Sequence, residues 1–258
     1  MGEILKVEGL TKDFGGLRAL SNYTLSLKEG ELVGLIGPNG AGKTTVFNLL
    51  TGVLKPTSGR IRFRGIDITG KRPDKIASLG MSRTFQNIRL FGALSVIDNL
   101  KIAYHMHRKY GLISALFNLS SFKREEEEIE LKAIKLLKLF DIERYKDRRA
   151  DSLPYGDQRK VEIVRALMTG PKLLLLDEPA CGMNPQETGE LMELIKRIRE
   201  EFSLTIFLIE HDMKVVMGIC ERIQVLNKGE LLAEGKPEEI RENPKVIEAY
   251  LGRRRRVA

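Results

Sequence analysis

A glycine-rich segment near the N-terminus carries the residue types that hold a phosphate group. Residues 37–44 read Gly-Pro-Asn-Gly-Ala-Gly-Lys-Thr and match the phosphate-loop pattern G-x-x-x-x-G-K-[ST] at every specified position. Glycines let backbone N–H groups close around an oxyanion, and a following helix adds the positive end of its dipole. The pattern assigns the Lys43 ammonium to the terminal phosphates and the Thr44 hydroxyl to Mg²⁺. The residues predicted to contact a nucleotide here are Gly37, Pro38, Asn39, Gly40, Ala41, Gly42, Lys43, Thr44 and Thr45.

A second feature with chemical potential is a pair of acids at the end of an apolar run. Residues 173–176 are all leucine, and Asp177 and Glu178 follow directly. In an open α/β sheet the carboxyl ends of the strands border the ligand crevice, which places Asp177 near the Mg²⁺. Glu178 is then placed to polarise an attacking water, an effect that contributes typically about 10²–10⁴-fold. Alone, the pair would fit the start of a surface loop equally well; beside the phosphate loop it predicts nucleotide hydrolysis.

The elements that would position these groups alternate between strand and helix patterns. Strands are predicted at residues 4–7, 23–27, 31–36, 60–64, 173–176 and 204–209, and helices at 43–54, 74–78 and around 191–202. Residues 222–226 and 230–233 flank a hairpin-like turn. The middle of the chain, from about 94 to 168, reads mostly as helix, with one helix following Gly156 and ending at Gly170-Pro171. This alternation predicts an α/β core with a parallel sheet and an inserted helical lobe.

Composition excludes several classes of protein. The chain has 258 residues, a net charge of +8 and two cysteines, which rules out a disulfide scaffold and predicts small core roles for Cys181 and Cys220. The longest uncharged stretch, residues 110–122, is shorter than the roughly 20 apolar residues of a membrane-spanning helix. The N-terminus lacks a signal peptide, so we expect a cytosolic location. The positive charge is concentrated in the first half, which suits phosphate ligands, nucleic acid or anionic lipid without choosing among them.

Five further segments, in order along the chain, match the sequence pattern of a known family. Phe14, Thr84-Phe85-Gln86-Asn87, Leu153-Pro154-Tyr155-Gly156-Asp157-Gln158, Gly182-Met183-Asn184-Pro185 and His211 all stand at expected places. With them, residues 4–251 resemble the ATP-binding subunit of ABC transporters. The resemblance implies that Phe14 stacks on adenine. It also implies that Gln86 is a metal ligand and takes part in catalysis. It also implies that His211 is the switch histidine and that Asp177 and Thr44 are metal ligands.

The same resemblance implies a fold and its division into parts. The expected fold is α/β, a P-loop NTPase (RecA-like) core with an antiparallel β subdomain and an inserted helical signature lobe. Residues 1–86 and 171–240 would form the nucleotide-binding core with its β subdomain, and residues 87–170 the helical lobe. Residues 241–258 would form a C-terminal helix and a basic tail, the latter read as solvated.

Two departures from the family pattern bear on how the site closes. The usual signature is Leu-Ser-Gly-Gly-Gln, but Pro154 replaces the serine and offers neither a hydroxyl nor an N–H. The contact to the γ-phosphate would then come from backbone N–H groups near Tyr155 and Gly156, at the start of a helix. Asn184 stands where many members have aspartate. Residues 85–91, 182–187 and 246–252 resemble the ATPase subunit of branched-chain amino-acid importers, and ATPases of urea or lipopolysaccharide systems share parts of this pattern.

The implied activity is transport-coupled ATP hydrolysis with Mg²⁺. The implied partners are a second ATPase subunit, identical or different, and transmembrane permease subunits contacted around residues 87–94, on the cytoplasmic face of the membrane. No contact with the transported substrate or with nucleic acid is expected. A DNA-repair or translation ATPase of the same family is the main alternative, but the chain has no long heptad run, no zinc-type cysteine pairs and one cassette. A GTPase is a weaker one, because Asn227-Lys228-Gly229-Glu230 ends in Glu where Asn-Lys-x-Asp needs Asp.

Overall fold

The computed structural model describes residues 2–104 and 120–251 of the chain. Its contacts group the chain into two compact units: residues 1–83 with 172–258, called the core unit here, and residues 84–171, called the helical unit. The basic tail at residues 253–256, His105 and His107 lie outside the described residues. None of the described helices is both long and apolar enough to cross a membrane.

A six-stranded sheet forms the centre of the core unit, in the order β10-β9-β3-β8-β7-β6. Strands β3, β6, β7, β8 and β9 run parallel to their neighbours, while β10 pairs antiparallel with β9. Every residue of β3, β7 and β8 is buried, as expected for strands covered on both faces. The bounds are β3 Leu32–Ile36, β6 Met81–Arg83, β7 Leu173–Asp177, β8 Thr205–Ile209, β9 Arg222–Asn227 and β10 Glu230–Gly235.

A second, antiparallel sheet completes the core unit, in the order β2-β1-β4-β5. Its strands are β1 Glu3–Phe14, β2 Leu17–Lys28, β4 Ser58–Phe63 and β5 Ile66–Asp67. β1 and β2 are longer than predicted. Register shifts carry their pairing past Gly9 and past the polar residues that bounded the predicted strands. The Tyr23 hydroxyl donates to Gln224 Oε1 at 2.5 Å, a buried bond between the two sheets.

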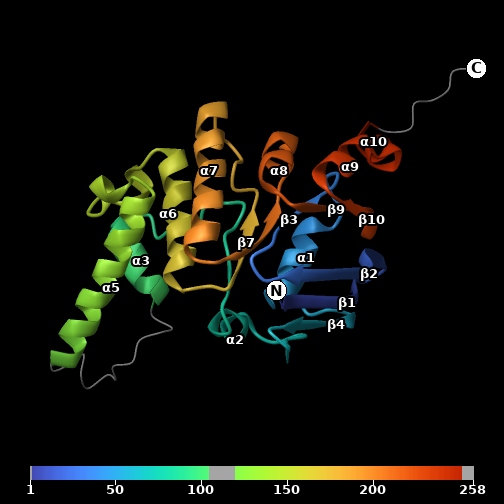
Figure 1. The fold of residues 1–258 in the computed structure, drawn as a ribbon. Helices are drawn as coiled ribbons and strands as arrows, with labels where there is room; N and C mark the ends of the chain where they lie inside the picture. The colour runs from blue at the N-terminus through green and yellow to red at the C-terminus, as the bar shows by residue number, and fades with distance from the viewer. Residues whose placement is uncertain (1, 105–119, 252–258) are drawn as a thin grey trace, which may run out of the picture. The chain divides into compact units, whose positions relative to one another are not determined.

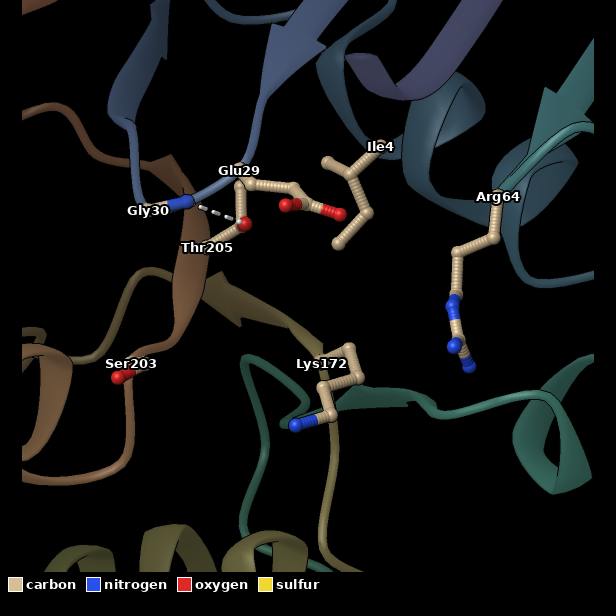
Figure 2. A pocket seen from close by; sticks show the side chains of 7 residues that line it. All are labelled: Ile4, Glu29, Gly30, Arg64, Lys172, Ser203 and Thr205. Atoms are coloured by element: carbon tan, nitrogen blue, oxygen red, sulfur yellow. Dashed lines mark hydrogen bonds between the residues drawn. The ribbon is translucent and has the colours of Figure 1, made fainter. Parts of the chain in front are cut away.

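Helix α1, Lys43–Leu50, starts in the phosphate loop and packs against β2 (Figure 1). Its Phe47 ring meets Phe207 of β8 at a centroid distance of 5.2 Å. The helix is shorter than the predicted 43–54, because the chain turns at Gly52, where φ is +72° and an added Cβ would lie 2.2 Å from the Lys71 carbonyl. The other helices of this unit are α2 Pro73–Ser78, α7 Pro185–Glu201, α8 Met213–Ile219, α9 Pro237–Glu242 and α10 Pro244–Leu251.

Within the described part of the helical unit, three helices pack against one another: α3 Val96–Ala103, α5 Ser120–Leu139 and α6 Tyr155–Met168 (Figure 1). Two short 3-10 helices, η2 Glu143–Tyr145 and η3 Ala150–Ser152, precede α6. The prediction that this helix follows Gly156 is wrong by two residues: α6 begins at Tyr155 with Pro154 as its N-cap. Proline suits the entry to a helix, since its missing N–H would have no intrahelical partner there.

Candidate functional site

Three neighbouring strands bring the predicted catalytic segments to one edge of the parallel sheet. The phosphate loop follows β3, the acid pair ends β7, and His211 follows β8. Ile209 of β8 stands opposite both Leu35 of β3 and Asp177 of β7. Because β8 lies between β3 and β7, segments far apart in the sequence meet at the carboxyl ends of adjacent strands. Ligands of open α/β sheets bind at this edge.

The phosphate loop has a backbone path that only glycine can follow at two points. Gly37 has φ +152°, and an added Cβ would lie 2.0 Å from the Leu226 carbonyl; at Gly42, with φ +104°, it would lie 2.8 Å from the Ala19 carbonyl. At Gly40, with φ +76°, the added atom would meet nothing within 4 Å. The loop is therefore closely packed on its protein side and open around Gly40.

The turn between β9 and β10 is hydrogen-bonded to the phosphate loop. The Gly229 N–H donates to the Ala41 carbonyl at 2.9 Å, and the Gly229 carbonyl accepts from the Ser21 N–H at 2.8 Å. The tetrapeptide that resembles a guanine-reading motif thus has a structural use, which removes the reason to invoke a GTPase.

Lys43 is held inside the loop. Its Nζ donates to the Gly37 carbonyl at 2.7 Å and to the Pro38 carbonyl at 3.1 Å, and the residue is 7% exposed. Burial lowers the pKa of Lys43, while Glu178 and Asp177 act to raise it. The three groups are therefore close enough to interact, and Lys43 is positioned to attract an anion between the loop and the acid pair. No side chain caps the start of α1, so no capping side chain bonds its first N–H groups. An uncapped helix start of this kind attracts anions.

Asp177 is an ion-paired, buried carboxylate. Arg83 of β6 donates from Nη2 to Asp177 Oδ2 at 2.6 Å, and the side chains are 5% and 4% exposed. Arg83 also donates to Asn48 Oδ1 at 2.7 Å, and its guanidinium lies 5.4 Å from the Phe47 ring centroid. Arg83 was not among the predicted site residues, because its partner lies far away in the sequence.

Glu178 adopts a left-handed backbone conformation that is rare for a residue with a side chain, with φ +48°. Its N–H donates to the Ile209 carbonyl at 2.9 Å, which fixes the turn at the strand end. Glu178 Oε2 lies 3.6 Å from Nδ1 of His211, whose side chain is 57% exposed. Backbone strain of this kind concentrates at functional sites.

A second unpredicted residue, the acid Glu210, positions the chain around His211. It is fully buried, and its carboxylate accepts from the N–H groups of Ala180 (2.9 Å), His211 (3.1 Å) and Asp212 (3.4 Å). Burial raises the pKa of Glu210, and the three amides act to lower it. Glu210 therefore links the segment after Glu178 to the segment that carries His211.

Phe14 ends β1 with its ring 45% exposed, and Lys12 Nζ lies 5.0 Å from the ring centroid. An exposed aromatic face fits the predicted stacking on a base. Tyr250 of α10 also reaches the phosphate loop: burial raises the pKa of Tyr250, and a hydrogen bond with the Gly37 backbone lowers it. Sequence analysis did not find this contact, since the C-terminal helix gave no chemical signal. Of the two cysteines, Cys220 is buried as predicted and Cys181 is partly exposed.

The remaining predicted residues, Gln86, Tyr155 and Gly156, belong to the helical unit. The Gln86 side chain is exposed, its carbonyl accepts from Arg159 Nη2 at 2.6 Å, and the same Nη2 donates to the Tyr155 hydroxyl at 3.1 Å. One buried arginine thus connects Gln86 with the first turn of α6. Arg159 was not predicted, because an arginine in an amphipathic helix normally faces solvent.

Oxygen atoms suited to Mg²⁺ are available where the sequence predicted them. Thr44 is exposed at the start of α1, and Asp177 carries a carboxylate at the end of β7. Among the described residues no three His, Cys, Asp or Glu side chains cluster as a metal site. Mg²⁺ is commonly held by one or two protein oxygens together with substrate phosphates, so the residues fit a metal that arrives with its nucleotide.

Comparison with known proteins gives this geometry a family. The family model described as "ABC transporter" matches residues 20–181, well over half of the chain. The chain therefore belongs to the ABC transporter family as one of its ATP-binding cassettes, and it is an ATPase.

Individual proteins of known description are similar to this chain over nearly its whole length. The high-affinity branched-chain amino acid transport ATP-binding protein LivG of Salmonella typhimurium is 52% identical over 96% of this chain and 98% of its own. BraF of Pseudomonas aeruginosa, of the same description, is 49% identical over 96% of this chain and 98% of its own. The family model described as "Branched-chain amino acid ATP-binding cassette transporter" matches residues 230–255.

Two solved structures are similar throughout. The ADP conformation of an ATP-binding cassette of an ABC transporter has 34% identity and a TM-score of 0.85, over 98% of this chain and 100% of its own. A dimeric bacterial ABC transporter cassette has 28% identity and a TM-score of 0.78, over 91% and 99% of the two chains. The fold class predicted from the sequence is confirmed.

Proposed function

We propose that this chain is the ATP-hydrolysing subunit of an importer for branched-chain amino acids, working as a dimer on permease subunits at the cytoplasmic face of the membrane. The observation that carries the proposal is the near full-length identity to LivG, joined to the C-terminal family match at residues 230–255. The urea and lipid alternatives have no comparable support, and neither does a role on nucleic acid.

The proposed roles of the core-unit residues and of Gln86 follow from the motifs to which they belong. Phe14 stacks on the base, and the amides of residues 37–45 with the Lys43 ammonium hold the phosphates. Thr44 and Asp177 hold Mg²⁺, with Gln86 as a further ligand; when bound, the ion neutralises charge on the phosphate oxygens. Glu178 polarises the attacking water, and His211, 3.6 Å from its carboxylate, positions that glutamate and the γ-phosphate. Positioning and electrostatic stabilisation are the main means of catalysis in phosphoryl transfer.

The second subunit has a defined contribution in this proposal. Tyr155 and Gly156 open α6, whose side chains leave its first N–H groups uncapped. A helix start of this kind attracts anions. We assign these amides to the γ-phosphate held by the opposite chain, in place of the hydroxyl that Pro154 lacks. The dimeric structure of a related cassette supports a two-chain assembly. The domain division proposed for this function is a core of residues 1–86 and 171–240 with a helical lobe of residues 87–170.

Two variants test the ATPase assignments. Glu178→Gln should bind Mg-ATP, hydrolyse it at least about a hundredfold more slowly, and sediment as a dimer with ATP. Lys43→Ala should lose tight ATP binding. Normal hydrolysis by the first variant, or unchanged affinity of the second, contradicts the corresponding role.

The transported substrate needs a separate test. The chain, co-purified with its permease subunits in lipid vesicles, should hydrolyse ATP faster when the cognate binding protein is loaded with leucine than when it is offered urea. Stimulation by urea alone would contradict the branched-chain assignment.

A further inference from the structure

Arg159 holds the main chain of the Gln86 segment inside the helical unit. Its Nη1 donates to the Phe85 carbonyl at 2.6 Å, and its Nη2 donates to the Gln86 carbonyl at 2.6 Å. Nη2 also reaches the hydroxyl of Tyr155, at the first turn of the same helix. These bonds use backbone carbonyls of the segment, and the Gln86 residue itself is exposed.

Two more side chains of α6 bond to the backbone of the segment that follows Gln86. Glu162 Oε1 accepts from the Arg89 N–H at 3.3 Å, and Arg165 donates to the Arg89 carbonyl. Arg159, Glu162 and Arg165 follow one another at intervals of three residues, so they share one face of the helix. That face therefore fixes residues 85–89 at both ends.

The central pair of this network is fully buried. Arg159 Nη1 lies 2.8 Å from Glu162 Oε2, and the side chains are 0% and 1% exposed. Burial raises the pKa of Glu162, and Arg159 acts to lower it. Buried ion pairs contribute little to stability, since apolar side chains of similar volume often replace them without loss. The pair therefore needs another explanation than stability.

We propose that Arg159 is a positioning residue that makes the Gln86 segment and the signature turn at Tyr155-Gly156 move as one piece. The inference rests on the proposed function, in which Gln86 contacts the nucleotide of its own chain and the signature turn contacts that of the partner chain. A shift of Gln86 on nucleotide binding is then carried to the signature turn through one guanidinium. Arg159 matters for closing the dimer rather than for binding ATP.

The first test uses the Glu178→Gln chain as parent and adds Arg159→Met with Glu162→Leu, which leaves no unpaired buried charge. The expected result is an unchanged affinity of the monomer for Mg-ATP. The ATP-dependent dimer should weaken by at least about tenfold, as lost charged hydrogen bonds imply. Arg159→Lys should weaken it too, because an ammonium cannot replace the planar fork. An ATP-dependent dimer of parental strength in both variants overturns the proposal.

A matched control separates positioning from general loosening of the unit. Lys132 of α5 donates to the Met168 carbonyl at 2.9 Å, at the other end of α6. Lys132→Met removes a bond from the same helix and should leave the dimer unchanged. Gln86→Ala should weaken the dimer, and adding the Arg159 and Glu162 replacements to it should weaken it little further. Equal losses in the control, or additive losses with Gln86→Ala, overturn the proposal.

Hydrogen exchange in the monomer keeps this inference distinguishable from the proposed function. Mg-ATP should change exchange at residues 86–89 and 155–158 together in the parent chain, but only at residues 86–89 in Arg159→Lys. Independent changes in the parent refute the coupling even if the dimer forms. A parent that shows coupled exchange but no dimer refutes the proposed closure and leaves the Arg159 link supported.

Discussion

Arg83 and Asp177 form a buried ion pair between neighbouring parallel strands, with 2.6 Å between Nη2 and Oδ2. The same guanidinium bonds Asn48 on α1 and lies over the Phe47 ring, so β6, β7 and α1 are joined at one point. Asp177 is also a proposed Mg²⁺ ligand. Arg83 therefore holds this carboxylate in position before any metal is bound, a form of preorganisation.

Replacing Arg83 should be costly, because it takes the arginine away from a buried carboxylate. We expect Arg83→Met to lower the free energy of unfolding by about 3–5 kcal/mol, the usual cost of breaking a buried pair from one side. Arg83→Met with Asp177→Asn should recover part of this loss. Urea unfolding of the three chains measures both effects. A loss below about 1 kcal/mol in the single variant would mean that solvent or another group satisfies Asp177.

The sequence predicted the parts of the site that lie in continuous runs. Residues 37–44 and the leucines before Asp177 each form a local pattern, and the structure puts both at strand ends. It could not predict the Arg83–Asp177 pair, because that contact depends on the parallel register of β6 with β7. Such register comes from packing of the whole sheet rather than from nearby residues.

Other features of the structure were also not predicted from the sequence. Arg159 and Glu162 are found inside the helical unit, although their residue types predict a solvent-facing position. The predicted start of α6 was two residues late, because the pattern placed the helix after Gly156, whereas Pro154 is its N-cap. The hydrogen bond of Tyr250 with the Gly37 backbone joins helix α10 to the phosphate loop, which no local pattern encodes.

Gly34 of β3 is required for close packing rather than for an unusual φ. A Cβ there would lie 2.9 Å from Cys220 Sγ and 3.2 Å from Val216 Cγ1. Gly34→Ala should destabilise the chain by about 1–3 kcal/mol through overpacking. Cys220→Ala removes the sulfur and should absorb part of that cost, so the double variant should be less unstable than the two single losses predict.

Thermal and urea unfolding check this pair of variants. Gly189→Ala on α7 is the matched control, because the added Cβ meets no atom within 4 Å. It should stabilise the helix by about 0.5–1 kcal/mol. Strictly additive losses at Gly34 and Cys220 would show that the clash is relieved elsewhere.

Asn184, one of the departures from the expected family pattern, caps α7. Its Oδ1 accepts from the N–H groups of Gln186 and Glu187 at 2.9 and 3.0 Å, and the Glu187 carboxylate accepts from the Asn184 N–H. Because Asn and Asp are equally good N-caps, Asn184→Asp should leave stability nearly unchanged. Asn184→Ala should cost about 1 kcal/mol. Differential scanning calorimetry distinguishes the two, and a large loss in Asn184→Asp would show that the departure from the family pattern matters for more than capping.

Glu210 should give the stability of the chain a specific dependence on pH. Burial raises the pKa of Glu210 above its ordinary value, despite the amides of Ala180, Asp212 and His211 that act to lower it. Between the ordinary and the raised pKa, the folded chain keeps a proton that the unfolded chain releases. The group's contribution to stability is therefore present at low pH and lost as pH rises through the folded pKa.

Glu210→Gln cannot titrate, so the wild-type advantage in unfolding free energy over this variant should shrink as pH increases from about 4 to about 8. Urea midpoints of both chains across this range measure the difference. Glu238→Gln, at an exposed carboxyl on α9, is the control for the effect of the amide replacement itself. A wild-type advantage that grows with pH would mean that the three amides outweigh burial and hold Glu210 as an anion, which would make it a fixed negative charge beside His211.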